Sequence, residues 1–259
     1  MKAVSRVPHC CAVDKDEYRR LAENGDSHWW FRSTRALLRQ LIGHELDRSE
    51  GAIYLDAAGA TGATGGWLTE SNPMVLADVD IFALEIGRDN FPGYRPMLAD
   101  INHLPIATGS MSAVLCVTAL CHRMNPDPAA VVREFARVTK PGGLVCLLEP
   151  GGKRLWRSHD NVTHTGRRFS VAELAGLAEQ AGLSVQRATG AYSFLVPPAA
   201  LRTVFERNKH TSDVGRNQTG LGGALGAMGA AERRLLRRFD LPFGLSAVVV
   251  ARQPTTVEP

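Results

Sequence analysis

The chain has 259 residues, of which 44% are apolar and 22% are charged, and its formal net charge is +4. This is the composition of a globular protein, and so small a positive surplus does not indicate a nucleic-acid partner. No apolar run approaches the roughly 18 residues that a membrane span needs, so we expect no membrane partner.

The five cysteines indicate a reducing compartment. Cys116, Cys121 and Cys146 fall in apolar, strand-like runs, and the odd count argues against a disulfide framework. The N-terminal stretch has no apolar core of the signal-peptide type, so we expect a cytoplasmic protein. Cys10 and Cys11 are adjacent, but no further Cys or His cluster at ligand spacing accompanies them, and we therefore expect no metal site.

Helical patterns come first and alternating strands and helices follow. Residues 14–47 carry apolar side chains at helical spacing, with a break at Asn24-Gly25. The next expected strands are 52–57, 74–78, 94–98, 112–118 and 144–150, and the helices between them are 63–70, 81–90 and 126–140. Continuous apolar strands that alternate with helices predict a doubly wound α/β fold with a parallel sheet covered on both faces.

The rest of the chain predicts one more helix, two strands and an insertion. Ser170 and Glu173 have the spacing of a capping box, and Gly182 ends the same helix. Strands are expected at 183–191 and 245–252; between them the alternation stops, and the glycine-rich stretch 211–230 looks flexible. The expected organisation is an N-terminal helical segment or lid (1–50), a core domain (51–190 with 241–254) and a helical cap insertion (191–240).

A glycine-rich turn, "GATGATG" at 59–65, follows the first of these strands. Ligands of open parallel sheets bind at such turns. Gly59, Gly62 and Gly65 have the spacing of a dinucleotide loop, which would make the protein an NAD(P)-dependent oxidoreductase. Asp56 disfavours a pyrophosphate at this place, and none of the four tyrosines has a lysine four residues later. A helix entry of small residues without any ligand is a third interpretation.

Three acids favour a different ligand. Asp56 and Asp78 end the first two strands after the helices and Asp100 follows the third, and Asp78 comes 22 residues after Asp56. S-Adenosylmethionine carries an amino group, a ribose diol and an adenine amine, and an acid after each strand could accept hydrogen bonds from one of them. This pattern predicts a binding site for that cofactor.

The motifs "YLDAAGATG", "VLADVDIFALEIGR", "MLADINHLPI" and "VTKPGGLVCLLEP" together resemble class I S-adenosylmethionine-dependent methyltransferases, in particular their type-11-like small-molecule group. Residues 28–32, "HWWFR", and the segments 155–174 and 241–252 are similar to further parts of one branch, so the resemblance covers almost the whole chain. It implies a Rossmann-like sheet of seven strands with the last one antiparallel. It also implies a methyltransferase, which we expect to methylate oxygen on a small molecule such as a sugar or specialised metabolite.

The resemblance implies the site residues as well. The expected cofactor contacts are Asp56, Ala58, Gly59, Ala60, Gly62, Asp78, Val79, Asp100, Ile101 and Thr118. His122 and His159 follow strands at the ligand edge and are the candidate bases. The candidate substrate contacts are Trp29, Trp30, Glu149, Asp160 and His164. A structural role is the alternative for each histidine, tryptophan and loop acid among them.

The chain also departs from the family pattern. Where the family has Asp-x-Gly-x-Gly-x-Gly, two glycines are replaced by Ala58 and Ala60, and alanine adds a methyl group where the backbone can require a positive φ. Ser112 stands where the family usually has Asp. These departures support a second hypothesis, a protein that binds S-adenosylmethionine but has altered catalysis. A homodimer is left open, and the basic run 232–238 predicts a solvated helix face.

Overall fold

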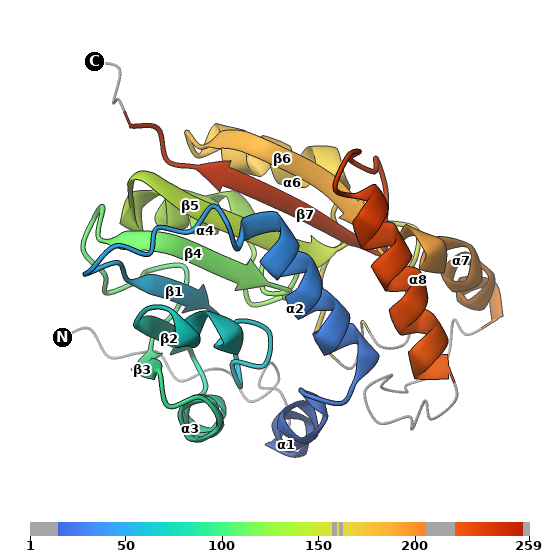
Figure 1. Cartoon of the computed structure of the whole chain (residues 1–259), viewed down its shortest axis with the longest axis horizontal. Helices are drawn as coiled ribbons and strands as arrows, with labels where there is room; N and C mark the ends of the chain where they lie inside the picture. Colours follow the sequence, from blue (N-terminus) through green and yellow to red (C-terminus); the bar gives the residue numbers. More distant parts are fainter. Residues whose placement is uncertain (1–14, 157–159, 161–162, 206–220, 256–259) are drawn as a thin grey trace.

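The computed structural model describes residues 15–156, 160, 163–205 and 221–255. Within these ranges, seven strands form one sheet in the order β3-β2-β1-β4-β5-β7-β6 (Figure 1). The strands are β1 (Tyr54–Ala57), β2 (Met74–Asp78), β3 (Tyr94–Leu98), β4 (Met111–Val117), β5 (Thr139–Pro150), β6 (Ser184–Ala191) and β7 (Ser246–Arg252). Strand β7 is antiparallel to both β5 and β6, and the other neighbours are parallel. The predicted doubly wound sheet with an antiparallel last strand is confirmed.

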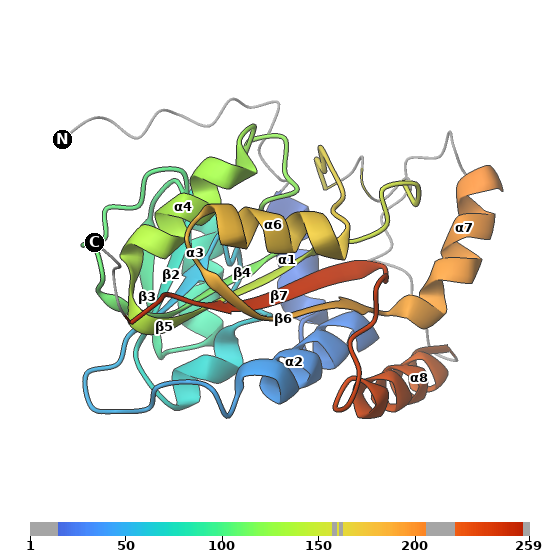
Figure 2. The same ribbon diagram turned by 90° about the horizontal axis from the view of Figure 1, so that it is seen from above.

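Helices cover both faces of this sheet (Figure 2). Helices α4 (Pro128–Val138) and α6 (Val171–Gln180) lie on one face, and α2 (Trp29–Ile42) and α8 (Leu221–Leu235) lie on the other. The central strands β4 and β5 are therefore buried on both sides, which explains why they read as continuous apolar runs and not as alternating ones.

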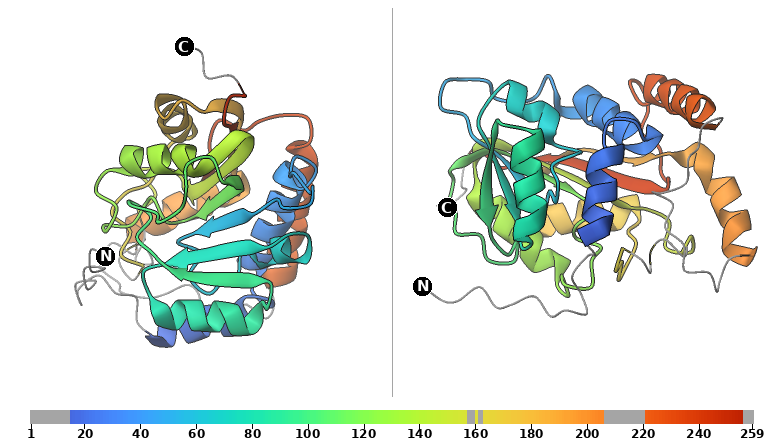
Figure 3. Two further views of the ribbon diagram at one scale, coloured as in Figure 1. Left: turned by 90° about the vertical axis from the view of Figure 1, so that its left-hand side faces the viewer. Right: turned by 90° about the horizontal axis from the view of Figure 1, so that it is seen from below.

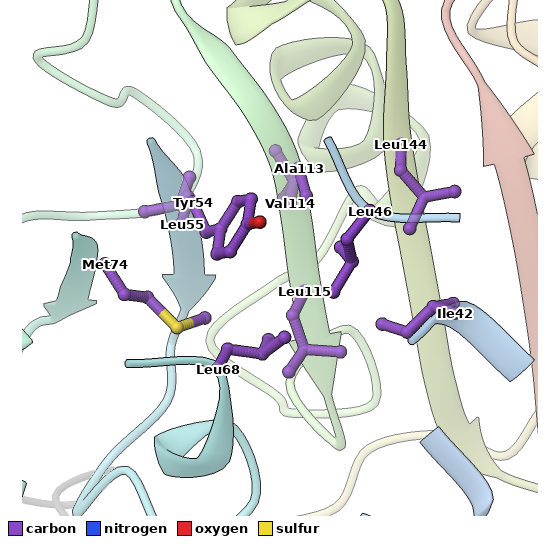
Figure 4. Close-up of a pocket in the computed structure, with 10 residues that line it drawn as sticks. All are labelled: Ile42, Leu46, Tyr54, Leu55, Leu68, Met74, Ala113, Val114, Leu115 and Leu144. Carbon is purple, nitrogen blue, oxygen red and sulfur yellow. The ribbon is translucent and has the colours of Figure 1, made fainter. Parts of the chain in front are cut away.

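The layer between α2 and the sheet is core and not a ligand site. Apolar side chains from α2, β1, β2, β4 and β5 meet there around a gap without room for a water molecule (Figure 4). The hydroxyl of Tyr54 donates to the carbonyl of Asp47 and to the side chain of Asn72 at the border of this layer. Every polar group of this tyrosine is thus engaged by the protein itself.

The N-terminal helices form where the sequence predicts them. Helix α1 (Lys15–Asn24) ends at the expected break, and α2 begins after it. Helix α1 packs on α3 (Ile81–Asn90), and the charged groups of Lys15 and Arg19 lie 5.3 and 5.2 Å from the ring centroid of Phe82. This contact holds α1 beside the outer strands β2 and β3.

The capping box predicted for α6 is present. The hydroxyl of Ser170 accepts the N–H of Glu173, and the carboxylate of Glu173 accepts the N–H of Ser170. Gly182 follows the helix with a φ of +81°. After β6 come the 3₁₀ helix η2 (Ser193–Leu195) and helix α7 (Val196–Phe205), and α7 and α8 lie at one end of the molecule (Figure 3).

Two predictions about elements are wrong. The helix expected over 63–70 is only the 3₁₀ helix η1 (Gly66–Glu70), because Gly62 has a φ of +71° and two further glycines, Gly65 and Gly66, follow before a helix can nucleate. Of the stretch expected to be flexible, residues 221–230 belong to α8, which packs on α2. Residues 211–220 lie outside the described ranges.

Candidate functional site

The carboxyl ends of the parallel strands form one edge of the sheet, and the expected site residues gather there. Asp56 of β1 pairs in register with Leu76 of β2 and Leu115 of β4, so the turns after these strands leave the sheet at nearly the same level. Strand β6 ends at the same edge, because the last residues of β5 and β6 both pair with Ser246 of β7. Ligands of open α/β sheets bind at this edge.

Asp78 connects the second strand to the turn after the first one. It is 6% exposed; its Oδ2 accepts the N–H of Ala60 at 3.0 Å and its Oδ1 accepts the N–H of Asp80 at 3.0 Å. Burial raises the pKa of Asp78 to about 6, against these two opposing bonds. A carboxylate has about four acceptor positions, so Asp78 can accept further hydrogen bonds. Val79, the next residue, is half-buried.

The two alanines of the turn have backbone conformations that favour glycine. Ala58 has a φ of +54° and Ala60 a φ of +50°, and both are partly exposed together with Gly59. A non-glycine residue in this region costs roughly 1–2 kcal/mol. The turn therefore keeps the backbone course of a glycine-rich loop although two of its members carry a methyl group.

The glycines of the turn are required by what lies beneath them. A Cβ atom at Gly59 would lie 2.5 Å from the carboxyl carbon of Asp56, and a Cβ at Gly62 or Gly65 would collide with Tyr94. Their regular spacing thus serves contact with the protein interior. This removes the feature that carried the dinucleotide interpretation, and no full α-helix follows the turn to receive a pyrophosphate.

Asp56 lies below the turn and not on its ligand side. Its side chain is fully buried, and its Oδ2 accepts the hydroxyl of Tyr94 at 2.5 Å. Its Oδ1 has no hydrogen-bond partner among the described residues. Burial raises the pKa of Asp56 to about 7, against the hydrogen bond from Tyr94. The expectation that this carboxylate faces the cofactor needs correction, because Gly59 and Gly65 separate it from the surface.

Asp100 is exposed and organises the turn after β3. Its Oδ1 accepts the backbone N–H and the side-chain amide of Asn102, at 2.9 and 2.7 Å. The same amide donates to Asn125, whose own amide donates to the carbonyl of Ala119. A chain of hydrogen bonds therefore joins the third acid to the turn after β4. Ile101 beside it is buried in the core.

Glu149 supports the turn after β4 from below. Its side chain is fully buried; Oε1 accepts the N–H groups of Ala119 and Leu120, and Oε2 accepts that of Cys121, at 2.9–3.1 Å. Burial raises the pKa of Glu149 to about 7, against these bonds. The expectation of a substrate contact is wrong here, because both oxygens are committed to the backbone. Thr118 begins this turn with a φ of +54° and is half-buried.

His122 follows this supported turn directly and lies near His164. Burial, with a contribution from the charge of His164, lowers the pKa of His122 to about 4. The backbone bridges of His122 with Thr165 and of Arg123 with His164 hold the two segments together. Neutral pH therefore leaves His122 uncharged and able to accept a proton. The other candidate base, His159, lies outside the described residues.

Asp160 is a structural residue and not an available substrate contact. It forms a buried two-pronged ion pair with Arg168, at 3.1 and 2.9 Å, and the same guanidinium donates to the carbonyl of Gly151 at 2.8 Å. This pair ties the segment after β5 to the residues before α6. We expected Asp160 to contact the substrate, but its side chain is buried in this ion pair.

Trp29 and Trp30 start α2, and Trp29 reaches the end of β6. Its ring meets the ring of Tyr192 edge to face at a centroid distance of 5.8 Å, and its indole N–H is buried without an acceptor among the described residues. Trp30 contacts Phe31 edge to face at 5.0 Å. Tyr192 has a φ of +56° and shares a 2.8 Å hydrogen bond with Thr34. Trp29 thus lies at the same sheet edge as the turn after β1, whereas Trp30 packs on its neighbour Phe31 in α2.

Sequence reasoning missed four residues of this edge. Tyr94, Asn102 and Asn125 link its acids and turns, as described above. Tyr18 of α1 is buried so close to Asp78 that this acid's charge adds to burial in raising the pKa of the phenol. None of these residues belongs to a recognisable motif; only the expected position of Tyr94 at the start of a strand could have directed attention to it.

Comparison with known families and proteins agrees with this geometry. A family model described as a methyltransferase domain matches residues 55–147, the stretch from β1 to β5. A ubiquinone/menaquinone biosynthesis C-methyltransferase from Legionella pneumophila is 29% identical over 158 residues, which are 57% of this chain and 59% of that protein. A malonyl-[acyl-carrier protein] O-methyltransferase from Hamiltonella defensa is 28% identical over 54% of this chain and 57% of that protein.

A solved structure of similar fold is phosphoethanolamine N-methyltransferase 2 from Haemonchus contortus in complex with S-adenosyl-L-methionine. It has a TM-score of 0.61 at 12% identity and covers 93% of this chain and 57% of that one. At this identity the likeness concerns the fold. The matches with the first curated relatives span between 25% and 59% of those proteins' own lengths.

Proposed function

We propose that this chain, which carries a class I S-adenosylmethionine-dependent methyltransferase domain, transfers a methyl group to a hydroxyl oxygen of a small molecule such as a sugar or specialised metabolite. The family match and the sheet order support the class of the reaction. The position and ionisation of His122 support an oxygen acceptor.

S-Adenosylmethionine is the cofactor of this domain, and the residues at the sheet edge fit it. The observation that carries the proposal is Asp78, whose carboxylate ends β2, holds the N–H of Ala60 and keeps acceptor capacity for the ribose diol. Asp100 is exposed at the next strand end and can accept from the adenine amine. The indole N–H of Trp29 is buried and lacks an acceptor among the described residues. It lies where β6 ends and can donate a hydrogen bond to a bound ligand.

When bound, the cofactor supplies a methyl group on a sulfonium for in-line displacement. The contribution of the protein is to align the acceptor, exclude water and remove a proton where the acceptor carries one. His122 is uncharged at neutral pH because burial lowers its pKa, so it can take the proton of a hydroxyl group. Glu149 fixes the backbone turn immediately before His122 and thereby its place.

The alternative acceptors are carbon and nitrogen. The curated relatives include a C-methyltransferase and an O-methyltransferase, so their names do not decide between acceptors. A hydroxyl oxygen becomes strongly acidic as it accepts the methyl group, so a weak base such as His122 suffices to take its proton during transfer, whereas a carbon acid must lose its proton before it attacks. We base the preference for oxygen on the neutral imidazole of His122 at the strand edge.

A second candidate function is cofactor binding with altered or absent turnover. The left-handed alanines Ala58 and Ala60 favour it, because both occupy conformations that cost free energy without glycine. Ser112, which replaces a usual Asp, is buried on β4 and donates its N–H to Ile53 within the sheet. Its replacement therefore concerns the interior of the sheet and leaves the exposed edge unchanged.

Calorimetry on the full chain, with S-adenosylmethionine and its demethylated product, tests the cofactor site. We expect both to bind, and we expect Asp78→Asn to weaken binding about 10–100-fold, since a hydrogen bond to a charged group contributes about 1.5–3 kcal/mol. Asp89→Asn, at an exposed acid of α3, is the matched control and should bind like the unmodified chain. If neither S-adenosylmethionine nor its demethylated product binds, the proposal is refuted.

Labelled methyl transfer separates the two candidate functions. The chain is incubated with methyl-labelled cofactor and a panel of hydroxyl, amine and carbon-acid compounds, and each product is assigned by mass and by the chemical shift of the new methyl group. An O-methyl product supports the first candidate. Binding of the cofactor without any product over the whole panel supports the second, and C- or N-methyl products alone would overturn the oxygen preference.

A further inference from the structure

Within the described residues, α8 is held by contacts with α2 and with the end of β6. The side-chain amide of Gln40 on α2 donates to the carbonyl of Arg233 at 2.8 Å. The carboxylate of Glu232 accepts the N–H groups of Tyr192 and Ser193 at 2.6 and 2.7 Å. The opposite side of α8 faces away from α2 at the periphery of the molecule (Figures 1 and 2).

This outward face is apolar where a solvated helix face is usually polar. Met228, Leu235 and Phe239 are exposed, Phe239 to 61%, and they recur seven and four residues apart, so they lie on one side of the helix. Helical hydrogen bonding continues to Phe239, whose N–H donates to the carbonyl of Leu235 at 3.1 Å. Phe243, in the loop that follows, is 58% exposed. Ala224, Ala227 and Ala231 are also exposed, so small side chains accompany the large apolar ones along this helix.

Arg234 and Arg238 lie beside the C-terminal end of the same face, and Arg237 is near it. Arg234, Arg237 and Arg238 are exposed, and none of the ion pairs among the described residues involves them. The acids nearby are engaged elsewhere: Glu232 holds the end of β6, and Asp240 pairs with Arg187 at 2.6 Å. The face therefore combines large apolar side chains with an unneutralised positive charge.

We propose that the outward face of α8 and the loop to Phe243, here called the α8 face, binds the surface of an anionic lipid bilayer. A helix with an apolar side and arginines beside it lies in the plane of such an interface, with its apolar residues among the acyl chains and its cations at the anionic head groups. The proposal goes beyond methyl transfer and does not depend on it. It replaces the expectation of no membrane partner, which rested on the lack of a spanning segment and not on a surface contact.

The charge distribution favours this occupant over two others. In a symmetric contact between two copies the same patch meets itself, which would bring the arginines of both copies together. A nucleic acid would satisfy the arginines but leave Phe239 and Phe243 in water. In the described parts of the chain no helix is long and apolar enough to cross a membrane, and attachment to a surface requires none.

Flotation of the full chain with lipid vesicles tests the proposal. Vesicles of phosphatidylcholine alone are compared with vesicles that contain phosphatidylglycerol. We expect binding to the anionic vesicles, weaker binding at high salt, and little binding to the neutral ones. The double variant Arg234→Gln/Arg238→Gln should weaken binding roughly 10–30-fold, because each basic residue near an anionic surface contributes about 1 kcal/mol.

Matched variants separate the α8 face from general charge. Arg32→Gln/Arg95→Gln removes the same charge from exposed arginines elsewhere and should bind like the unmodified chain. Leu235→Ser/Phe239→Ser keeps the charge and should also lose binding. Circular dichroism checks that each variant is folded, and the salt titration of the unmodified chain stands independently of any variant.

Three outcomes would overturn the proposal. These are no binding to anionic vesicles, an equal loss in the Arg32/Arg95 control, or a dimer in analytical ultracentrifugation that Leu235→Ser/Phe239→Ser dissolves. The last outcome would assign the α8 face to a second copy of the chain.

Discussion

Tyr94 donates a 2.5 Å hydrogen bond to Asp56 beneath the turn that follows the first strand, and both side chains are buried. Three glycines of that turn owe their lack of a side chain to these two residues, since a Cβ at each of them would collide with one or the other. The pair therefore supports the turn after β1 from the side of the protein interior. Its integrity should govern the shape of the turn although it lies on the side away from the ligand.

Tyr94→Phe should destabilise the protein by about 1–3 kcal/mol at pH 8, because it leaves a buried carboxylate without its hydroxyl partner. At pH 5, below the Asp56 pKa of about 7, the carboxyl group is largely protonated, and the loss should be smaller. Urea unfolding at both pH values measures this. In a double-mutant cycle with Asp56→Asn the two changes should couple by about 0.5–3 kcal/mol; additive effects would contradict the described pair.

Stability should fall as the pH rises from about 4 to about 7. Asp56, Asp78 and Glu149 have raised pKa values in the folded protein, so the native state binds more protons than the unfolded chain in this interval. His122 acts in the opposite direction up to about pH 6.5, since its folded pKa is lowered to about 4. Three acids outweigh one histidine, and urea midpoints between pH 4 and 8 should therefore decline.

Glu149→Gln should reduce that pH dependence and also destabilise the protein by about 1–3 kcal/mol, because its amide NH₂ cannot accept the N–H of Cys121. Glu179→Gln, at an exposed acid of α6, is the control and should change neither quantity. The same urea midpoints at pH 5 and pH 8 provide the measurement. An unchanged pH slope in Glu149→Gln would show that this carboxylate does not titrate as described.

His122→Gln should lower the methyl-transfer rate about 100-fold or more, while cofactor affinity measured by calorimetry stays within about twofold. The exposed His44 provides the control, and His44→Gln should leave both quantities unchanged. With a pKa of about 4, His122 should not cause the rate to fall between pH 8 and pH 5. A normal rate in His122→Gln would show that the acceptor needs no base at this position.

Ala58→Gly/Ala60→Gly should not destabilise the protein and should stabilise it by up to about 1 kcal/mol. Glycine relieves the cost of a positive φ at both positions, and the greater freedom of the unfolded chain offsets part of the gain. Ala57→Gly, in the preceding strand, should instead cost about 0.5–1 kcal/mol. Thermal unfolding distinguishes the two; a clear loss in the double variant would mean that the alanine methyl groups pack usefully.

Arg168→Ala should destabilise the protein by about 3–5 kcal/mol, since it removes the guanidinium that pairs with the buried carboxylate of Asp160. Its neighbour Arg167, whose side chain bonds only the carbonyl of Pro126 among the described contacts, should tolerate the same change far better. Equal effects of Arg167→Ala and Arg168→Ala on the midpoint of unfolding would be inconsistent with the buried ion pair.

The sheet could be predicted from the sequence because each strand carries its own local signal. Apolar runs bounded by turn residues mark β1, β2, β4 and β5, and the family resemblance supplies their order and the antiparallel β7. The cofactor of the domain was identified from the same resemblance. The 3₁₀ helix η1 was missed because the closely spaced glycines that prevent a full helix also match a glycine-rich helix entry.

The roles of the site acids could not be predicted, because a residue's place at a strand end does not say to which side its carboxylate points. Asp56 and Glu149 turn toward the interior, and their partners lie 38 and about 30 positions away along the chain. Asp78 is also buried, but its carboxylate faces the turn after β1, where it accepts the N–H of Ala60. Such choices depend on long-range contacts, which no local pattern contains.

The insertion between the sixth and seventh strands begins and ends at one place. Ala191 and Ser246 are register partners, so the chain leaves the sheet and returns to it across a single rung of the ladder. Gly190 and Gly244 allow the two ends to cross, since a Cβ at either would collide with backbone of the other end. Both ends of the insertion thus leave the sheet at one point, and α8 within it also packs on α2. An insertion with such closely spaced ends can change in length or sequence while β6 and β7 keep their pairing, and with them the sheet edge at which we propose that the cofactor binds.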